Sequence, residues 1–461
     1  MSMSSPVHPP MDQFAFEDGE LVIGGQRLSR LAERVGATPF YAYDRALLAR
    51  RVGELRQALP AAVKLHYAMK ANPLPALVCL MVGLVDGIDV ASAGELQVAL
   101  NAGAPAAEVS FAGPAKAASE LRQAVAAGVL VNVESLREVQ LLEGISSSLA
   151  IPARVAVRVN PDFELKGSGM KMGGGPKQFG IDVDDVPDVL ARIGSAGLAF
   201  EGFHLFAGSQ NLRAESICDA QRQSFELALR LAEHAPGPVR FLNLGGGFGI
   251  AYLSDDDPVS PHDVAGRLRA VVAAECAAFD LPVPRLAVEP GRAIAGPGTV
   301  TLYEIGTIKP VRLGASGAPG APLVRNYVSV DGGMSDNIRT ALYDAAYTCV
   351  LANRTSDAPP ALCRVVGKHC ESGDVLVRDL WLPADVQPGD LLAVAATGAY
   401  CWSMASNYNY LLKPPVVAVR DGAATEIVRR QTLSDVFALD PVLAGSAPAV
   451  PPSQPAVGVE V

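Results

Sequence analysis

The segment VKLHYAMK (63–70) begins a pattern that continues for more than 200 residues. It opens the first of eight short apolar runs, and segments with helical spacing of apolar residues lie between these runs. Eight strand–helix repeats between Val63 and Arg292 fit the ~250 residues of a closed (β/α)8 barrel, which is an α/β fold. An open doubly wound sheet is the alternative, but no G-x-G-x-x-G follows the first run. The predicted strands are Val63–Met69, Gly87–Val90, Glu108–Ala112, Leu130–Val133, Arg154–Val159, Phe200–Phe206, Arg240–Leu244 and Arg285–Val288; the predicted helices include Ala93–Ala102, Ser119–Ala127, Leu136–Glu143, Asp185–Ile193, Ala214–Ala232 and Val264–Phe279.

The chain changes character after Arg292, where helical periods become rare and strand-like runs follow one another. The final pair of runs, with Asp421-Gly422 between them, predicts a hairpin. We therefore predict a barrel over residues 36–295 and a mostly β domain over 296–435, with segment 15–35 joining the β domain. Residues 1–14 and 436–461 are predicted to be disordered tails, because they are rich in residues that oppose packing. The expected strands are Ile305–Val311, Tyr327–Val330, Thr348–Ala352, Cys363–Val366, Val375–Leu382, Leu391–Ala396, Val416–Val419 and Thr425–Arg429.

Composition excludes several classes of protein. The 461 residues are 49% hydrophobic and 19% charged, which is typical of a folded chain with a sizeable core. The net charge of −10 argues against a protein that coats nucleic acid. No apolar run reaches the ~18 residues of a membrane span, and no secretory signal is visible, so we expect a cytoplasmic protein. The seven cysteines include no C-x-x-C pair, which argues against a zinc ribbon or a disulfide framework.

The ends of the predicted barrel strands carry reactive side chains, and barrel active sites lie at those ends. Lys70 closes the first strand, Gly245–Gly247 follow the seventh, and Glu289 and Arg292 follow the eighth. A lysine amine at an apolar strand end suits Schiff-base chemistry, while consecutive glycines offer backbone N–H groups to a phosphate. A carboxylate can keep a pyridine nitrogen protonated. Each feature alone has an ordinary structural explanation, but together they predict pyridoxal 5'-phosphate as the cofactor.

The sequence resembles the fold-type III decarboxylases that depend on pyridoxal phosphate, over roughly residues 15–435. The resemblance implies an alanine-racemase-type barrel followed by a β domain, and a homodimer with two shared active sites. The matching motifs are YAMKANP (67–73), DVASAGEL (89–96), LGGGFG (244–249), EPGR (289–292), DGGMSDNIRTALY (331–343), HCESGD (369–374) and ATGAY (396–400).

The same resemblance implies roles for individual residues. Lys70 would be the Schiff-base lysine, Glu289 would face the pyridine nitrogen, and Cys370 would donate a proton across the dimer interface. The remaining residues expected around the cofactor are Asp89, Phe206, Ser209, Gly245, Gly246, Gly247, Gly291, Arg292 and Tyr400.

The motifs of the C-terminal half are most similar to those of diaminopimelate decarboxylases. The distal end of meso-diaminopimelate carries a carboxylate and an ammonium. Arg339 can grip the carboxylate in a bidentate manner, Tyr343 can add a hydroxyl, and Glu371 can take the ammonium. Arg292 and Tyr400 are expected at the substrate as well as at the cofactor.

Two features differ from that branch and leave other substrates open. Phe206 stands where the branch has a histidine stacked on the cofactor ring, and the loop at 165–182 is long and rich in Gly and Lys. Both resemble decarboxylases associated with exosortase systems or with carrier-protein-bound amino acids. The alternatives are therefore a decarboxylase of another amino acid, free or bound to a carrier protein, a catalytically inactive regulator of this fold, and a racemase.

Overall fold

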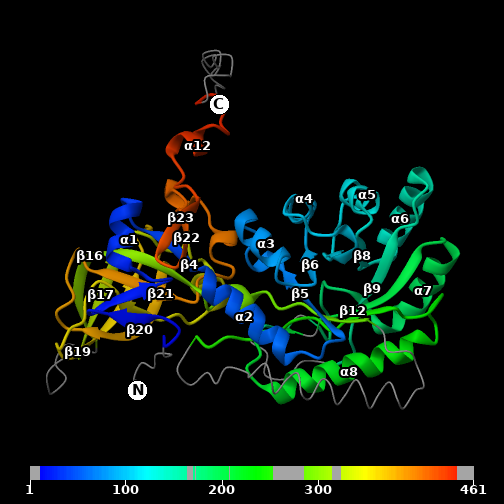
Figure 1. Cartoon of the computed structure of the whole chain (residues 1–461), viewed down its shortest axis with the longest axis horizontal. Helices are drawn as coiled ribbons and strands as arrows, with labels where there is room; N and C mark the ends of the chain where they lie inside the picture. Colours follow the sequence, from blue (N-terminus) through cyan, green and yellow to red (C-terminus); the bar gives the residue numbers. More distant parts are fainter. Residues whose placement is uncertain are drawn as a thin grey trace, which may run out of the picture.

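The computed structural model describes residues 11–163, 170–171, 173–206, 208–252, 285–313 and 323–443. Two domains lie side by side, with the barrel on the right and the β domain on the left of Figure 1. Eight parallel strands pair in chain order, and the last pairs with the first, which closes the barrel and confirms the predicted fold. The barrel strands are β5 (Val63–Ala68), β6 (Gly87–Val90), β7 (Val109–Phe111), β8 (Leu130–Val133), β9 (Arg154–Asn160), β12 (Ala199–Leu205), β14 (Phe241–Asn243) and β15 (Arg285–Val288).

Helices surround the barrel and pack their apolar faces on its strands. Two of them begin at a serine whose hydroxyl accepts a backbone hydrogen bond, from Glu95 N to Ser92 Oγ at 3.1 Å and from Glu138 N to Ser135 Oγ at 3.3 Å. Such caps fix where a helix starts after a strand. The predicted helix Val264–Phe279 lies outside the described residues. The helices around the barrel are α3 (Pro75–Val82), α4 (Ala93–Asn101), α5 (Ala118–Ala127), α6 (Leu136–Leu149), α7 (Val186–Ser195) and α8 (Ala214–Ala232).

Side chains fill the barrel interior, as they do in other closed barrels of eight strands. Leu130, Ala156, Phe241 and Ala287 form one buried cluster from four different strands. The interior is therefore a packed core, and open space for a ligand has to lie at an end of the barrel. Three shorter strands accompany it: β10 (Met170–Lys171) pairs with β13 (Gly208–Ser209), and β11 (Ile181–Asp182) runs parallel to β9.

The β domain contains the predicted strands and the predicted hairpin, in which β22 and β23 pair through Arg420↔Ala423. Its long strand β16 pairs with β17, β21 and β4 along its length. Two short helices, α11 (Arg339–Tyr343) and α12 (Leu433–Phe437), accompany the sheet. The strands are β16 (Thr299–Leu313), β17 (Leu323–Val330), β18 (Cys349–Leu351), β19 (Pro360–Val366), β20 (Val375–Pro383), β21 (Leu391–Ala395), β22 (Val416–Arg420) and β23 (Ala423–Val428).

The N-terminal part of the β domain extends beyond the predicted boundary at residue 36. Strand β4 (Phe40–Asp44) lies between β16 and β22 in the second sheet, whereas the sequence predicts that residues 36–295 all belong to the barrel. The following helix, α2 (Arg45–Ala58), begins at Asp44, whose carboxylate accepts a hydrogen bond from Leu47 N at 2.9 Å. The barrel is therefore inserted, in sequence, between two parts of the β domain.

The segment before β4 packs on the same domain. Strands β1 (Ala15–Glu17), β2 (Glu20–Ile23) and β3 (Gln26–Arg27) form a small sheet that is followed by α1 (Leu28–Val35). Its apolar side chains share a core with Val300, Leu302 and Ala393. Met11 and Phe14 are buried in that core, which corrects the prediction that residues 1–14 are all disordered. Within the described ranges, no helix has both the length and the apolar character needed to cross a membrane.

Candidate active site

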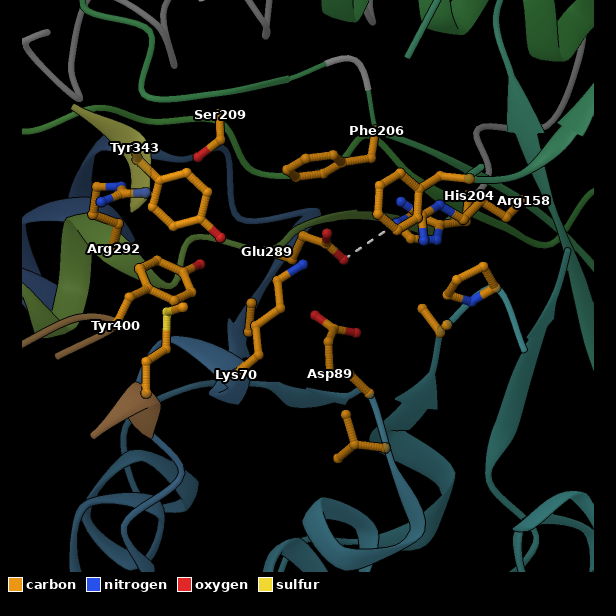
Figure 2. A pocket seen from close by; sticks show the side chains of 18 of the residues that line it. Lys70, Asp89, Arg158, His204, Phe206, Ser209, Glu289, Arg292, Tyr343 and Tyr400 are labelled. Atoms are coloured by element: carbon orange, nitrogen blue, oxygen red, sulfur yellow. Dashed lines mark ion pairs between the residues drawn. The ribbon is translucent and has the colours of Figure 1, made fainter. Parts of the chain in front are cut away.

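A cavity of about 320 Å³ opens at the C-terminal ends of the barrel strands and is lined from both domains. Figure 2 shows the charged side chains pointing into it from different strands. Most of the predicted site residues are among those that line it. These are Lys70, Asp89, Phe206, Ser209, Glu289, Arg292, Arg339, Tyr343 and Tyr400.

Lys70 lies in a short turn of 3-10 helix, Met69–Ala71, directly after β5. Its amine points into the cavity beside the Glu289 carboxylate (Figure 2), and Nζ is 5.3 Å from the centroid of the Phe206 ring. The backbone is closely packed here, since a Cβ added to Gly291 would lie 2.7 Å from the carbonyl oxygen of Ala68. The backbone next to Lys70 is thus closely packed, while the amine points into the cavity.

Glu289 is a buried carboxylate that stays ionised. It is 6% exposed, and its Oε2 accepts a hydrogen bond from Asn243 Nδ2 at 2.9 Å. The Nε2 atom of His204 lies 3.3 Å from the same oxygen. Burial acts to raise the pKa of Glu289, but His204, Lys70 and Arg158 outweigh it and hold that pKa well below the usual range. The site therefore keeps a negative charge at the end of β15.

Asp89 supplies a second buried carboxylate at the end of β6. Its Oδ1 contacts His66 Nδ1 at 3.2 Å and accepts a hydrogen bond from Ser110 Oγ. Its other oxygen, Oδ2, is buried without a hydrogen-bond partner among the described residues. An unpaired buried oxygen beside a cavity is an acceptor that a ligand can satisfy.

The glycine turn after β14 is not among the residues that line the cavity, but it packs against Glu289, which does, and against Gly208. A Cβ added to Gly246 would lie 2.6 Å from the carbonyl oxygen of Glu289, and one added to Gly247 would lie 2.6 Å from that of Gly208. Gly247 also has φ +88°, which disfavours other residues. Only glycine therefore lets this turn pass so close to the backbone of Glu289 and of Gly208, whose neighbour Ser209 lines the cavity.

Two buried arginines meet where the β domain covers the barrel. Arg292 and Arg339 are 5% and 4% exposed, and each donates a hydrogen bond from Nη1 to the hydroxyl of Tyr252, at 3.0 and 2.9 Å. Arg339 also donates to Tyr347 at 2.7 Å. Both guanidinium groups lie over the Tyr400 ring, at 4.8 and 5.9 Å from its centroid. Neither forms an ion pair with a carboxylate of the described residues, so the pair favours an anionic ligand.

Sequence reasoning missed several residues of this site. Tyr252 and Tyr347 carry no motif signal, because their role depends on arginines that are far away in sequence. Arg158, in contrast, lies on β9 and points into the cavity, where it contacts Glu134 at 2.9 Å and lies 5.0 Å from the centroid of the Phe179 ring. The alternation in RVAVRVN (154–160) contained the signal for Arg158, since every second side chain of a strand faces the same side.

The predicted residues Gly245, Gly246, Gly247 and Gly291 do not line the cavity but are close to residues that do, whereas Cys370 and Glu371 lie in a separate loop. Both are exposed in the loop between β19 and β20, and neither lines the cavity. The backbone N–H of Cys370 donates to Asn409 Oδ1 at 3.2 Å, and Glu371 Oε1 accepts from Ser372 Oγ at 3.1 Å. Lys70 and Cys370 therefore do not share a site within one chain.

Comparisons with known proteins match this geometry. Residues 45–296 match the family model described as the pyridoxal binding domain of pyridoxal-dependent decarboxylases. The chain is 42% identical to the diaminopimelate decarboxylase of Mycobacterium leprae over 438 residues, which is 92% of this chain and 90% of that protein. It is 36% identical to the diaminopimelate decarboxylase of Bacillus subtilis over 432 residues, or 92% of this chain and 96% of that protein.

Solved structures agree with the sequence relatives. The crystal structure of diaminopimelate decarboxylase from M. jannaschii with L-lysine has a TM-score of 0.83 at 28% identity, and the match covers 93% of this chain and 97% of that one. The Helicobacter pylori diaminopimelate decarboxylase with L-lysine has a TM-score of 0.78 at 28% identity, with coverage of 89% and 99%. The similarity therefore extends over the barrel and the β domain together.

Proposed function

The chain belongs to the family of pyridoxal-dependent decarboxylases, and on that basis we propose that it converts meso-diaminopimelate to L-lysine. It is an enzyme that uses pyridoxal phosphate. The observation that carries the choice of substrate is the pair of buried arginines, Arg292 and Arg339, at the edge of the cavity that holds Lys70. A substrate with a second carboxylate gives these cations an anionic partner.

The residues of the cavity fit the cofactor. When bound, pyridoxal phosphate supplies an electron sink for the electron pair that remains when CO2 leaves. Lys70 would offer the amine for the aldehyde carbon, and Glu289, whose pKa is held low, would face the ring nitrogen as an anion and favour its protonated form. Ser209, the Gly245–Gly247 turn and Arg292 are proposed to hold the phosphate. Asp89 Oδ2, unpartnered within the described chain, is available as an acceptor at the ring.

Phe206 is proposed to cover one face of the cofactor ring. It lines the cavity and lies opposite the Lys70 amine, at 5.3 Å from its ring centroid to Nζ. A phenyl ring can stack on an aromatic cofactor without a charge or a hydrogen bond of its own. The replacement of histidine by phenylalanine therefore removes a titratable group and keeps the stacking surface.

The substrate is proposed to be read at its distal end. Arg339 would grip the distal carboxylate, and the Tyr343 hydroxyl, which points into the cavity in Figure 2, would add a hydrogen bond. Glu371 is proposed to take the distal ammonium. Because Glu371 does not line the cavity of its own chain, it would have to come from a second copy.

We also propose that two copies of the chain complete each other's sites. Cys370 is exposed, and its loop contacts Tyr408 and Asn409. Tyr408 is 43% exposed and Tyr410 62% exposed, and Leu342 at the end of β-domain helix α11 is 55% exposed. Burial of such side chains favours association. In the dimer, Cys370 of one chain would donate a proton to the substrate carbon that has lost CO2, in the site that contains Lys70 of the other chain. The cytoplasmic location stays a prediction from the sequence.

The function is tested with the purified holoenzyme and a panel of amino acids. Protein saturated with pyridoxal phosphate is incubated with meso-diaminopimelate, lysine, ornithine, arginine and a carrier-protein-bound amino acid, while CO2 and amine products are measured. Rapid CO2 release with formation of lysine from diaminopimelate is expected. No turnover of diaminopimelate, with clear turnover of another member of the panel, would contradict the proposed substrate but leave the decarboxylase chemistry intact.

A further inference from the structure

We propose that Asp374 is a positioning residue that acts on the reaction through Cys370. The inference rests on the proposed function, in which Cys370 donates a proton in the site of a second copy. Asp374 is 3% exposed and lies at the end of the Cys370 loop, before β20. It joins this loop to the segment that leads to Arg339.

One carboxylate accepts three hydrogen bonds from two parts of the chain. Its Oδ2 accepts from the backbone N–H of His369 at 2.8 Å and from Nδ1 of the His369 ring at 2.8 Å. Its Oδ1 accepts from the backbone N–H of Met334 at 2.6 Å. A buried carboxylate with three donors fixes the groups around it, because loss of any partner leaves a desolvated polar group. Asp374 thus sets the position of His369, the neighbour of Cys370.

A second set of contacts holds the other side of the Cys370 backbone. The His369 ring stacks on Tyr408, with centroids 5.7 Å apart and an interplanar angle of 12°. The next residue, Asn409, accepts the hydrogen bond from Cys370 N at 3.2 Å. The backbone around Cys370 is therefore fixed by Asp374 and by Asn409, while its thiol side chain remains exposed. Such an arrangement presents a group to a surface with little conformational freedom.

The segment that leads to Arg339 also packs closely against Asp374. A Cβ added to Gly333 would lie 2.6 Å from Asp374 Oδ1 and 2.5 Å from His369 Nδ1, so the carboxylate and the imidazole occupy the space a side chain would need. Lys368 N donates to the carbonyl oxygen of Gly332 at 3.0 Å, which ties the same two segments again. Arg339 follows six residues after Gly333. Asp374 therefore connects the residue that reads the substrate of its own site with the proton donor for the other site.

The first experiment compares Asp374→Asn with the wild-type holoenzyme. Asparagine keeps the size of the side chain but replaces one acceptor oxygen with an N–H donor, so at least one of the three hydrogen bonds is lost. We expect kcat for diaminopimelate to fall roughly ten- to a hundred-fold, within the range for an impaired general acid. The KM should change less than about threefold, because Arg339 still binds the distal carboxylate. A fall in kcat of less than about threefold would overturn the proposal.

Asp390→Asn is the matched control. Asp390 is also 3% exposed and in the β domain, and it accepts hydrogen bonds from Arg354 at 2.7 and 3.0 Å and from Gln387 N at 3.0 Å. It does not line the cavity. Both variants thus lose one buried carboxylate of the β domain, but Asp390 bonds to Asn353, Arg354 and Gln387, whereas Asp374 bonds to the neighbour of Cys370. We expect kcat of the control within about twofold of the wild type; a fall equal to that of Asp374→Asn would overturn the proposal.

A double variant separates positioning from a merely structural effect. If Asp374 acts through the thiol, adding Asp374→Asn to Cys370→Ala should lower kcat by no more than about twofold further, because residues that act as one unit are not additive. Multiplication of the two losses would overturn the proposal. Should Asp374→Asn fail to fold, His369→Phe keeps the inference testable, since it keeps a ring on Tyr408 and removes both ring nitrogens, of which Nδ1 is the one bonded to Asp374. A smaller fall in kcat is expected for it, and it too should be silent in the Cys370→Ala background.

Mixed dimers identify the side on which Asp374 acts. When Asp374→Asn subunits are mixed with Lys70→Ala subunits, one site takes Lys70 and Arg339 from the first chain and Cys370 from the second. Rescue as large as that of Cys370→Ala with Lys70→Ala supports the proposal. No rescue, when the second pair does rescue, would show that Asp374 acts elsewhere. If the second pair also fails despite subunit exchange, the shared-site dimer of the proposed function is wrong, and the double variant still tests Asp374.

Discussion

Arg339→Ala tests the proposed substrate most directly. The guanidinium of Arg339 is buried and already oriented by the hydroxyls of Tyr252 and Tyr347, at 2.9 and 2.7 Å. It does not have to be reorganised when a carboxylate arrives, which favours a strong contact. Removing one partner of a buried, charge-assisted pair costs about 2–4 kcal/mol, which corresponds to a roughly 30- to 900-fold loss in kcat/KM.

Because Arg292 remains as a neighbouring cation, we expect the loss in kcat/KM to lie near the middle of that range. Arg292 shares the hydroxyl of Tyr252 with Arg339, so a second positive charge remains when Arg339 is removed. We therefore expect kcat/KM for meso-diaminopimelate to fall by roughly a hundred-fold, or about 3 kcal/mol. For amino acids without a distal carboxylate, such as lysine and ornithine, the already low activity should change little. The preference for diaminopimelate should thus decrease strongly.

The assay measures CO2 release at several concentrations of each substrate, with the cofactor in excess. Arg378→Ala serves as the control, because Arg378 is on β20, its side chain is 52% exposed, and it bonds to the exposed Asp344. The control should match the wild type. A loss below about fivefold for Arg339→Ala, or an equal loss for substrates with and without the distal carboxylate, would refute the argument from charge.

Other variants test the cofactor, the proton donor and the charge balance of the β domain. Lys70→Ala should lack the visible absorption that borohydride abolishes in the wild type; persistence of the same reducible band would exclude Lys70 as the binding amine. Cys370→Ala should lower turnover by roughly ten- to ten-thousand-fold, and wild-type rates would exclude its role. Burial raises the pKa of Asp336 from 3.8 to about 7, so the folded state binds more protons than the unfolded one between these values, and stability falls as pH rises through that window. Asp336→Asn should therefore unfold at a higher urea concentration than the wild type at pH 8 but not at pH 4, a difference of up to about 4 kcal/mol; curves that differ equally at both pH values would contradict this.

The sequence allowed the barrel to be predicted strand by strand because each strand is a local apolar run. Predicted and observed bounds agree at Gly87–Val90, Leu130–Val133 and Arg285–Val288, and the reactive residues at strand ends then converge through the geometry of the barrel. Strand β4 escaped prediction because its partners in β16 and β22 are remote in sequence. No local pattern states which of two sheets a short apolar run will join.

Site residues at strand ends could be predicted from the sequence, whereas residues whose role depends on tertiary contacts could not. Lys70 and Glu289 could be placed because a strand end defines their position. Tyr252 could not be placed, because its hydroxyl accepts hydrogen bonds from two arginines that are remote in sequence. The separation of Cys370 from the cavity also follows from tertiary structure alone, and only the family resemblance suggested that a second chain is involved.

The position of β4 between β16 and β22 has a consequence for biosynthesis. When β4 leaves the ribosome, its neighbour Thr299–Leu302 is still about 250 residues from being made, which at ~5–20 residues per second is roughly 13–50 seconds. The barrel strands are synthesised during that interval. Phe40, Tyr41 and Tyr43 meanwhile lack the strands β16 and β22 with which β4 pairs. We expect the nascent barrel to fold first, with an unpaired apolar strand still attached at its N-terminal side. Chaperone binding should therefore concentrate on the first 60 residues during translation and end when β22 has been made.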